Sequence, residues 1–308
     1  MNLLFFGSSS FSVPALVSLH SSISCVVTKK TKPKGRGYLL EDNEVKRAAL
    51  SLGLPVREIG SFKDEEAAGL GELKLDLLVV VSFGLIIPRW FLDLPTLGAI
   101  NVHPSLLPKY RGPSPMQWAI RNGEGKTGIT VIRMSERMDA GDILYQENVR
   151  LAPEEDAASL SNRLASRVSE ILPPIVEEVK VKGVGHGTPQ DDREASYTPI
   201  ITKEMGRIDW SLEATEIIRQ VKAFVLWPTA YTFLDGKTIK VFKVEPSHAI
   251  SAPKSAPGTI LASTPAGIEV SAGAGSLILQ EIQLENRKRM AASDFARGYR
   301  QISAKLFT

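Results

Sequence analysis

The chain has 308 residues, a formal net charge of +3, and 43% hydrophobic and 23% charged residues, as is typical of a soluble globular protein. The single cysteine, Cys25, excludes an internal disulfide and a multi-cysteine zinc site, and no apolar run reaches the length of a membrane span. Because the sequence also begins without the features of a secretory signal, we expect a cytoplasmic protein of two domains.

Short apolar runs alternate with helix-like segments over residues 1–125. The pattern predicts strands at 2–7, 23–30, 75–84 and 98–103, and helices at 10–20 and 41–53. Strands that alternate with helices favour a parallel sheet covered on both faces. This part is therefore predicted to be a doubly wound α/β domain with a mostly parallel sheet.

A hairpin and a long helix follow. Residues 127–134 and 142–151 alternate as two strands around a turn, which indicates a hairpin that extends the sheet. Apolar residues at helical spacing begin near residue 155, and the pair Pro173-Pro174 is expected to kink that helix. The catalytic domain is thus predicted to span residues 1–183.

The second half of the chain has a different pattern. Residues 184–205 are polar, rich in Gly and Pro and without a period, which predicts a linker. A helix is expected at 212–224, a hairpin around Asp235-Gly236, and short strands at 258–264, 267–273 and 276–284. Residues 206–308 are therefore predicted to form a small OB-like β-barrel.

Two nucleotide-binding patterns fail on their context. Gly125-Lys126-Thr127 resembles the end of a P-loop, but Ile120 occupies the position of the required earlier glycine, and a strand follows instead of a helix. Gly7 is followed by Ser8-Ser9-Ser10, so the glycine fingerprint for NAD is missing. The four histidines lie too far apart in sequence for a metal site, so we expect neither metal nor NAD.

Asn101 and His103 end an apolar strand with one residue between them. Side chains alternate along a strand, so both point to the same face. The simpler interpretation is a structural histidine at a strand end, with its hydrogen bonds made within the fold. Open α/β sheets, however, bind ligands at the carboxyl ends of their strands. An amide that donates to an oxyanion and an imidazole that moves a proton suit acyl-type transfer.

Asp139 is the natural third member of this set. It lies in the turn "RMDAGD" between the two hairpin strands, where Asp is also common for conformational reasons alone. A carboxylate beside His103 would orient the ring, but the spacing does not establish that the two are close.

"INVHPSLLPKYRG", followed by Asp139 in "MDAGD", resembles the folate-dependent formyltransferases. Further segments match in order, namely "SFGLIIP", "GRIDWS", "AFVLWPTAY", "PGTI" and "RMAASDFARG", so the resemblance covers residues 2–300. It implies that Asn101, His103 and Asp139 are the catalytic set for direct attack by the amine. In this mechanism Asn101 and protonated His103 would stabilise the oxyanion, while Asp139 would hold His103 charged and help to relay the departing amine proton. It also implies 10-formyltetrahydrofolate as formyl donor and the α-amine of methionine on charged initiator tRNA as acceptor, for translation initiation by a monomeric enzyme.

The resemblance assigns the folate site to two loops. The residues expected to contact the donor are Phe83, Gly84, Leu85, Ile86, Ser105, Leu106, Leu107 and Pro108. The backbone of residues 82–87 would hydrogen-bond the pterin, while Leu85 and Ile86 would line its slot.

The expected RNA contacts are basic. Lys34 and Arg36 lie in a glycine-containing loop similar to the one with which tRNA-specific members grip the acceptor end. Arg287, Lys288 and Arg289 form a second basic patch, and residues 203–308 carry a net charge of +4. The simpler interpretation of both segments is a solvated basic loop.

The sequence also departs from the tRNA-specific members. Ser8-Ser9-Ser10 replaces a usual Thr-Pro pair, Pro104 replaces a frequent Gly, and "GPSP" replaces "GAAP". Three alternatives stay open: a sugar-nucleotide formyltransferase, a formyltetrahydrofolate hydrolase, and an RNA-binding module on an inactive scaffold.

Overall fold

The computed structural model describes residues 1–31, 41–63, 65–247, 255–299 and 302–308. The chain divides into two compact units. The first comprises Met1–Pro115, Lys126–Arg150 and Leu160–Pro199, and the second comprises Met116–Gly125, Leu151–Ser159 and Ile200–Thr308. Lys34 and Arg36 of the predicted RNA-binding loop lie outside the described residues.

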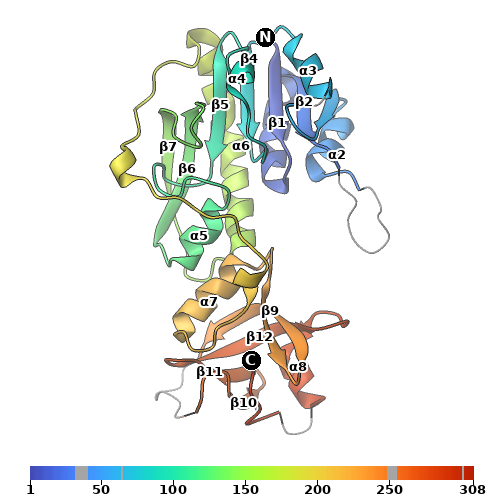
Figure 1. Cartoon of the computed structure of the whole chain (residues 1–308), viewed down its shortest axis with the longest axis vertical. Helices are drawn as coiled ribbons and strands as arrows, with labels where there is room; N and C mark the ends of the chain where they lie inside the picture. The colour runs from blue at the N-terminus through green and yellow to red at the C-terminus, as the bar shows by residue number, and fades with distance from the viewer. Residues whose placement is uncertain (32–40, 64, 248–254, 300–301) are drawn as a thin grey trace. The chain divides into compact units, whose positions relative to one another are not determined.

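The first unit is built on one sheet, with seven strands in the described part of the chain, in the order β3-β2-β1-β4-β5-β6-β7 (Figure 1). The first five strands are parallel to one another. They are β1 (Leu3–Gly7), β2 (Ile23–Lys29), β3 (Val56–Ile59), β4 (Leu77–Val81) and β5 (Gly98–His103). All five residues of β1 are buried, so both faces of the sheet are covered, as the doubly wound prediction requires.

Helices connect these strands. They are α1 (Val13–Leu19), α2 (Glu44–Ser51), α3 (Glu65–Gly71) and α4 (Arg89–Leu92). Asn43 caps α2, because its side chain accepts a hydrogen bond from the backbone N–H of Lys46 at 3.0 Å. One apolar cluster contains Leu70 of α3, Phe91 of α4 and Phe6 of β1, and the rings of Phe91 and Phe6 lie with their centroids 5.5 Å apart.

The predicted hairpin is confirmed as β6 (Lys126–Arg133) and β7 (Ile143–Arg150). Both strands are antiparallel to their neighbours and extend the sheet beyond β5. The helix α6 (Ala157–Lys182) then lies along the sheet (Figure 1) and is one continuous helix through Pro173 and Pro174. A short helix, α5 (Pro115–Arg121), precedes β6.

Residues 184–199, the larger part of the predicted linker, pack on the first unit. Val184 donates its N–H to the carbonyl of Leu97, and Thr188 pairs with Ile143 at the edge strand β7. Further along, Tyr197 bridges to Arg111. Because the backbone of this stretch is paired with the sheet edge and with the loop after β5, it is part of the first unit despite its polar, aperiodic sequence.

The second unit contains α7 (Ala214–Ala223) and α8 (Ala292–Arg297) with an antiparallel sheet. Within the described residues its strands run β10 (Ile260–Thr264), β11 (Gly267–Ser271), β12 (Ser276–Leu284), β9 (Lys237–Pro246) and β8 (Ala230–Leu234). A short strand, β13 (Met290–Ala291), pairs with β12. The predicted turn at Asp235-Gly236 is confirmed, since both residues have positive φ angles, 49° and 76°.

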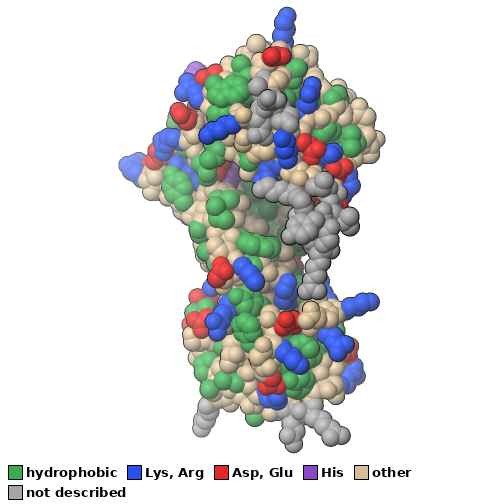
Figure 2. All heavy atoms as spheres, turned by 45° about the vertical axis from the view of Figure 1, so that its right-hand side comes forward, with side chains coloured by type: hydrophobic (Ala, Val, Ile, Leu, Met, Phe, Trp, Pro, Cys, Tyr) green, Lys and Arg blue, Asp and Glu red, His purple; other side chains and the backbone are tan. Residues whose placement is uncertain are grey.

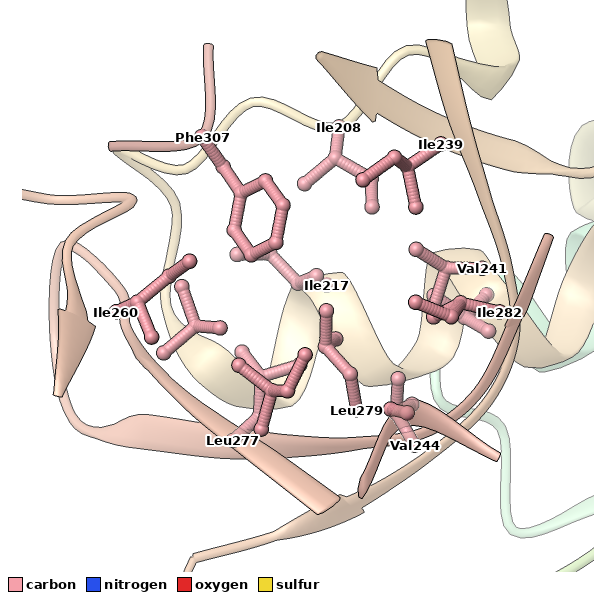
Figure 3. Packing of buried hydrophobic residues seen from close by; sticks show 14 of the residues in the cluster. Ile208, Ile217, Ile239, Val241, Val244, Ile260, Leu277, Leu279, Ile282 and Phe307 are labelled. Carbon is pink, nitrogen blue, oxygen red and sulfur yellow. The ribbon is translucent and has the colours of Figure 1, made fainter. Parts of the chain in front are cut away.

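The end of the chain closes this sheet into a barrel. Thr308 exchanges two backbone hydrogen bonds with Phe233 of β8, while Phe307 donates to Gly258 just before β10. The two edge strands are thus joined through the same short segment, which leaves few free backbone groups at the edges. Phe307 and Ile217 of α7 fill the interior (Figure 3).

Within the described residues, no helix is both long enough and apolar enough to cross a membrane.

Candidate active site

Asn101 and His103 lie at the carboxyl end of β5, in the interior of the sheet. Asn101 pairs with Val80 of β4 on one side and Ile132 of β6 on the other, so its backbone is fixed from both sides. His103 is 5% exposed, whereas Asn101 is half-buried, and among the described residues its side-chain amide has no hydrogen-bond partner. The amide is therefore free to donate to a bound group.

The two ring nitrogens of His103 have different surroundings. Nε2 lies 2.9 Å from the carbonyl oxygen of Tyr110, which accepts hydrogen bonds only, so we assign the hydrogen to Nε2. Nδ1 lies 3.6 Å from Oδ2 of Asp139. This assignment leaves Nδ1 as the nitrogen that can take up or release a proton at the site.

Asp139 reaches His103 from the turn between β6 and β7. Its backbone is in the left-handed region, with φ of 50°, and its side chain is 14% exposed. Oδ2 also accepts a hydrogen bond from the backbone N–H of Gly112 at 2.8 Å. The structure thus brings together all three residues of the predicted catalytic set, although their catalytic role is still a prediction.

The first predicted folate loop follows β4. Strands β2 and β3 lie on one side of β1 in the sheet, whereas β4 lies on its other side. The strand order therefore reverses between β1 and β4, and ligands bind open α/β sheets at such a switch point. Ser82 and Gly84 have positive φ angles of 49° and 74°, which turn the backbone sharply. Ile86 is 79% exposed, whereas Phe83 is buried in the apolar cluster under the sheet, so only its backbone is available to a ligand.

The second predicted folate loop follows His103. Ser105 is buried and donates its hydroxyl to the carbonyl of Lys109 at 2.7 Å, while the N–H of Leu107 bonds to Thr130 Oγ1 at 3.2 Å. Leu107 is also buried. Leu106 lies against Gly128, and a Cβ added to Gly128 would come within 2.4 Å of the Leu106 side chain. The side chains of this loop therefore set its shape, and Leu106 and Pro108 are the two members that stay half-exposed.

The basic patch in the second unit divides into two kinds of side chain. Arg287 and Lys288 are exposed in the turn after β12. Arg289 forms an ion pair with Glu281 at 3.2 Å and lies over the ring of Phe242 at 3.6 Å. Arg287 and Lys288 are thus available to a polyanion, whereas Arg289 has partners of its own.

A hollow beside this turn was missed from the sequence. It has a volume of about 670 Å³, and its lining includes Trp227, Tyr231, Phe233, Lys203 and Lys240. The signal was present, because "AYTFL" places its aromatic residues at alternate positions that face outward from the barrel. Positive and hydrophobic side chains are neighbours on the second unit in the lower part of Figure 2, with acidic side chains among them.

A metal centre has no support in the described part of the chain, where no group of three or more His, Cys, Asp or Glu side chains could bind an ion.

Comparison with known proteins points to one family. Residues 2–176 match the formyl transferase family, and residues 200–300 match the formyl transferase C-terminal domain. The chain is 40% identical over 304 residues to a methionyl-tRNA formyltransferase of Geobacter metallireducens, covering 97% of this chain and 96% of the relative. It is 42% identical over 312 residues to a methionyl-tRNA formyltransferase of Koribacter versatilis, covering 99% and 97%.

Solved structures share the fold at lower identity. An N-formyltransferase from Helicobacter canadensis, in complex with folinic acid and dTDP-3-aminofucose, has a TM-score of 0.68 and 17% identity over 91% of this chain and 98% of that chain. HypX from Aquifex aeolicus, in complex with tetrahydrofolic acid, has a TM-score of 0.64 and 22% identity over 98% of this chain and 47% of that chain. These similarities concern the fold alone.

Proposed function

The chain belongs to the formyl transferase family, and on that premise we propose that it transfers the formyl group of 10-formyltetrahydrofolate to the α-amine of methionine carried by initiator tRNA. The observation that carries the chemistry is the pair formed by Asp139 Oδ2 and His103 Nδ1, with His103 on the same strand end as Asn101, whose side-chain amide has no hydrogen-bond partner among the described residues. The acceptor is supported by relatives that are about 40% identical over nearly the whole chain and are named for methionyl-tRNA.

The neutral amine attacks the formyl carbon directly. A bond forms between the amine nitrogen and the formyl carbon, and the carbonyl electrons move onto oxygen. The developing oxyanion accepts a hydrogen bond from the Asn101 amide. When the oxyanion collapses, the bond between the formyl carbon and N10 of the folate breaks, and N10 takes up the proton that the amine has lost.

His103 moves that proton. Because Nε2 donates to the carbonyl of Tyr110, Nδ1 is the nitrogen that accepts the proton from the attacking amine and passes it on. The Asp139 carboxylate stabilises the imidazolium formed in between and holds the ring plane. No covalent enzyme intermediate is required, since the amine is itself the nucleophile.

The donor fits the loop after β4. The backbone turns sharply at Ser82 and Gly84, whose carbonyls accept from the N–H of Ser8 and from Nζ of Lys29. Backbone N–H groups of this loop can pair with the polar edge of a pterin, and the exposed Ile86 offers apolar surface beside them. Asn101 and His103 lie on β5, which is next to the end of β4, since Val81 of β4 pairs with Val102 of β5. A donor whose pterin binds at this loop would therefore present the formyl group on its N10 toward the ends of β4 and β5.

The RNA is proposed to contact the second unit through charge and stacking. Arg287 and Lys288 can pair with phosphates, and the same turn borders the hollow that contains Trp227 and Tyr231. Exposed aromatic rings next to lysines suit unpaired bases next to phosphates. Charged initiator tRNA is used in translation, which takes place in the cytoplasm. We therefore further propose that the protein works there.

The alternatives differ in their acceptor. The structural neighbours include a sugar-modifying enzyme, but at 17% identity it shares only the fold with this chain. A hydrolase would use water, and an inactive RNA-binding module would bind RNA without binding folate. The side chains of the catalytic set favour transfer over a binding role, since the side-chain amide of Asn101 has no hydrogen-bond partner among the described residues.

One acceptor panel separates these functions. Labelled 10-formyltetrahydrofolate is supplied with methionyl initiator tRNA, free methionine, methionyl elongator tRNA or an amino-sugar nucleotide, and product and free formate are both measured. We expect label on the methionyl initiator tRNA at a rate far above the other acceptors. Preferred transfer to the sugar, or formate release at the same rate without any acceptor, would reject the proposed function.

A further inference from the structure

Gln190 connects two loops of the active site with its side-chain amide. Its Nε2 donates hydrogen bonds to the backbone carbonyls of Asp139, at 2.8 Å, and Gly141, at 2.7 Å. Its Oε1 accepts from Nε and Nη2 of Arg111, at 3.1 and 2.8 Å. An amide has two N–H donors and two strong acceptor positions, so every hydrogen-bonding position of this side chain is used.

Arg111 is held as rigidly as Gln190. The residue is fully buried, and its remaining Nη1 donates to Asp192 Oδ1 at 2.9 Å and to the hydroxyl of Tyr197 at 3.1 Å. A buried guanidinium with four of its five N–H donors hydrogen-bonded is a fixed point, because any displacement would leave those donors unsatisfied.

The chain on either side of Arg111 contacts the catalytic set. Tyr110 precedes it and accepts the hydrogen bond from His103 Nε2, at 2.9 Å. Gly112 follows it and donates to Asp139 Oδ2, at 2.8 Å. Arg111 is therefore tied to the His103 ring through the residue before it, while Gln190 ties it to the turn that carries Asp139.

We propose that Gln190 is a positioning residue for formyl transfer, which fixes the Asp139 turn against the Arg111 loop and so sets the approach of the Asp139 carboxylate to His103. This inference rests on the proposed function, because it assumes that the His103–Asp139 pair moves the proton of the attacking amine. The hydrogen bonds of Gln190 involve neither the His103 ring nor the Asp139 carboxylate. It acts through the backbone of Asp139, whose left-handed φ of 50° makes the turn dependent on its surroundings.

Two substitutions separate positioning from mere folding. Gln190→Met keeps the length of the side chain but removes all four hydrogen bonds. Gln190→Glu keeps an acceptor for Arg111 but replaces the NH2 group, which supplies both donors, with one oxygen that faces the carbonyls of Asp139 and Gly141, which repels the turn. Gln280→Met is the matched control, since Gln280 is a half-buried glutamine of the second unit that bonds to Glu245.

We expect both Gln190 variants to lose kcat by about ten- to a hundredfold, because small displacements of catalytic groups have effects of this size. KM for folate and for tRNA should stay within about twofold, since Gln190 lines neither proposed substrate surface. The Gln280→Met control should retain its kcat. Melting temperatures of all variants report whether each protein is folded. If Gln190→Met does not fold, Gln190→Glu serves as the test.

A double-mutant cycle decides whether the effect passes through Asp139. In an Asp139→Asn background, the Gln190 substitution should cause little further loss of single-turnover rate, because the group it positions is already disabled. Unchanged kcat in folded Gln190→Glu, or an equal loss in both backgrounds, would overturn the inference. If the wild type does not formylate methionyl-tRNA, or Asp139→Asn is fully active, the proposed function fails instead.

Discussion

The backbone N–H of Gly112 donates to Oδ2 of Asp139 at 2.8 Å, and the same oxygen lies 3.6 Å from Nδ1 of His103. One carboxylate oxygen thus joins the loop after β5 to the turn between β6 and β7. The hydrogen bond from Gly112 orients the carboxylate toward His103. The protein's own backbone therefore fixes the direction of this charge, as electrostatic catalysis requires.

Replacement of Asn101 or His103 should remove activity while the fold remains. Losing one oxyanion donor costs on the order of a hundredfold in rate, so Asn101→Ala should lower kcat by about that factor or more. His103→Ala should have at least as large an effect. Steady-state transfer assays and circular dichroism check this, with Asn148→Ala, at an exposed position of β7, as the control. Normal turnover in either active-site variant would remove the mechanism.

The basic turn of the second unit should control the salt dependence of RNA binding. Replacing Arg287 and Lys288 with Ala together should reduce the slope of log affinity against log salt by about one to two, one for each lost phosphate contact. Arg289→Ala should instead lower the melting temperature, since it loses Glu281 and Phe242. Lys182→Ala, at the end of α6, controls for net charge. An unaltered slope in the double variant would mean that the turn is simply solvated.

Cys25 should be unreactive in the folded protein. Burial raises the pKa of the Cys25 thiol, with a smaller opposing effect from Arg57, so little thiolate forms near neutral pH. A thiol reagent at pH 8 should modify the native protein slowly and the denatured protein rapidly. Equal rates in the two states would contradict the buried position of Cys25 in β2.

Asp192 should give the fold a dependence on acid pH. The hydrogen bonds from Arg137 and then Arg111 lower the pKa of the Asp192 carboxyl below its usual value. Its stabilising effect is therefore complete above the unfolded pKa of about 4 and is lost as the pH falls through the lower, folded value. Asp192→Asn should reduce the urea midpoint at pH 7, and the difference from wild type should shrink below about pH 4. A difference that grows at acid pH would contradict this ion pairing.

The sequence predicted those parts of the fold whose signal is local. The apolar strand that ends in Asn101 and His103, the hairpin after it, and the Asp235-Gly236 turn all follow from residue alternation and turn chemistry. The closing of the barrel by Phe307 and Thr308 did not follow, because the last residues pair with strands that are distant in sequence.

The candidate site could be predicted only in part for the same reason. The approach of Asp139 to His103 depends on how the hairpin folds back, and spacing does not determine that geometry. The side chain of Phe83 is buried in the apolar cluster, so the ligand contact that its motif predicts would go through its backbone. Gln190 lies in a polar stretch without periodicity, so nothing in its own neighbourhood distinguishes it from a surface residue.

The most direct test of the account is single-turnover transfer of labelled formyl from 10-formyltetrahydrofolate to methionyl initiator tRNA, by the wild type and by Asp139→Asn side by side. The account predicts rapid formylation by the wild type. It predicts a rate lower by about a hundredfold or more in the variant, with both substrates still bound. Transfer by Asp139→Asn at the wild-type rate, or release of formate by the wild type without formylation of the tRNA, would contradict it.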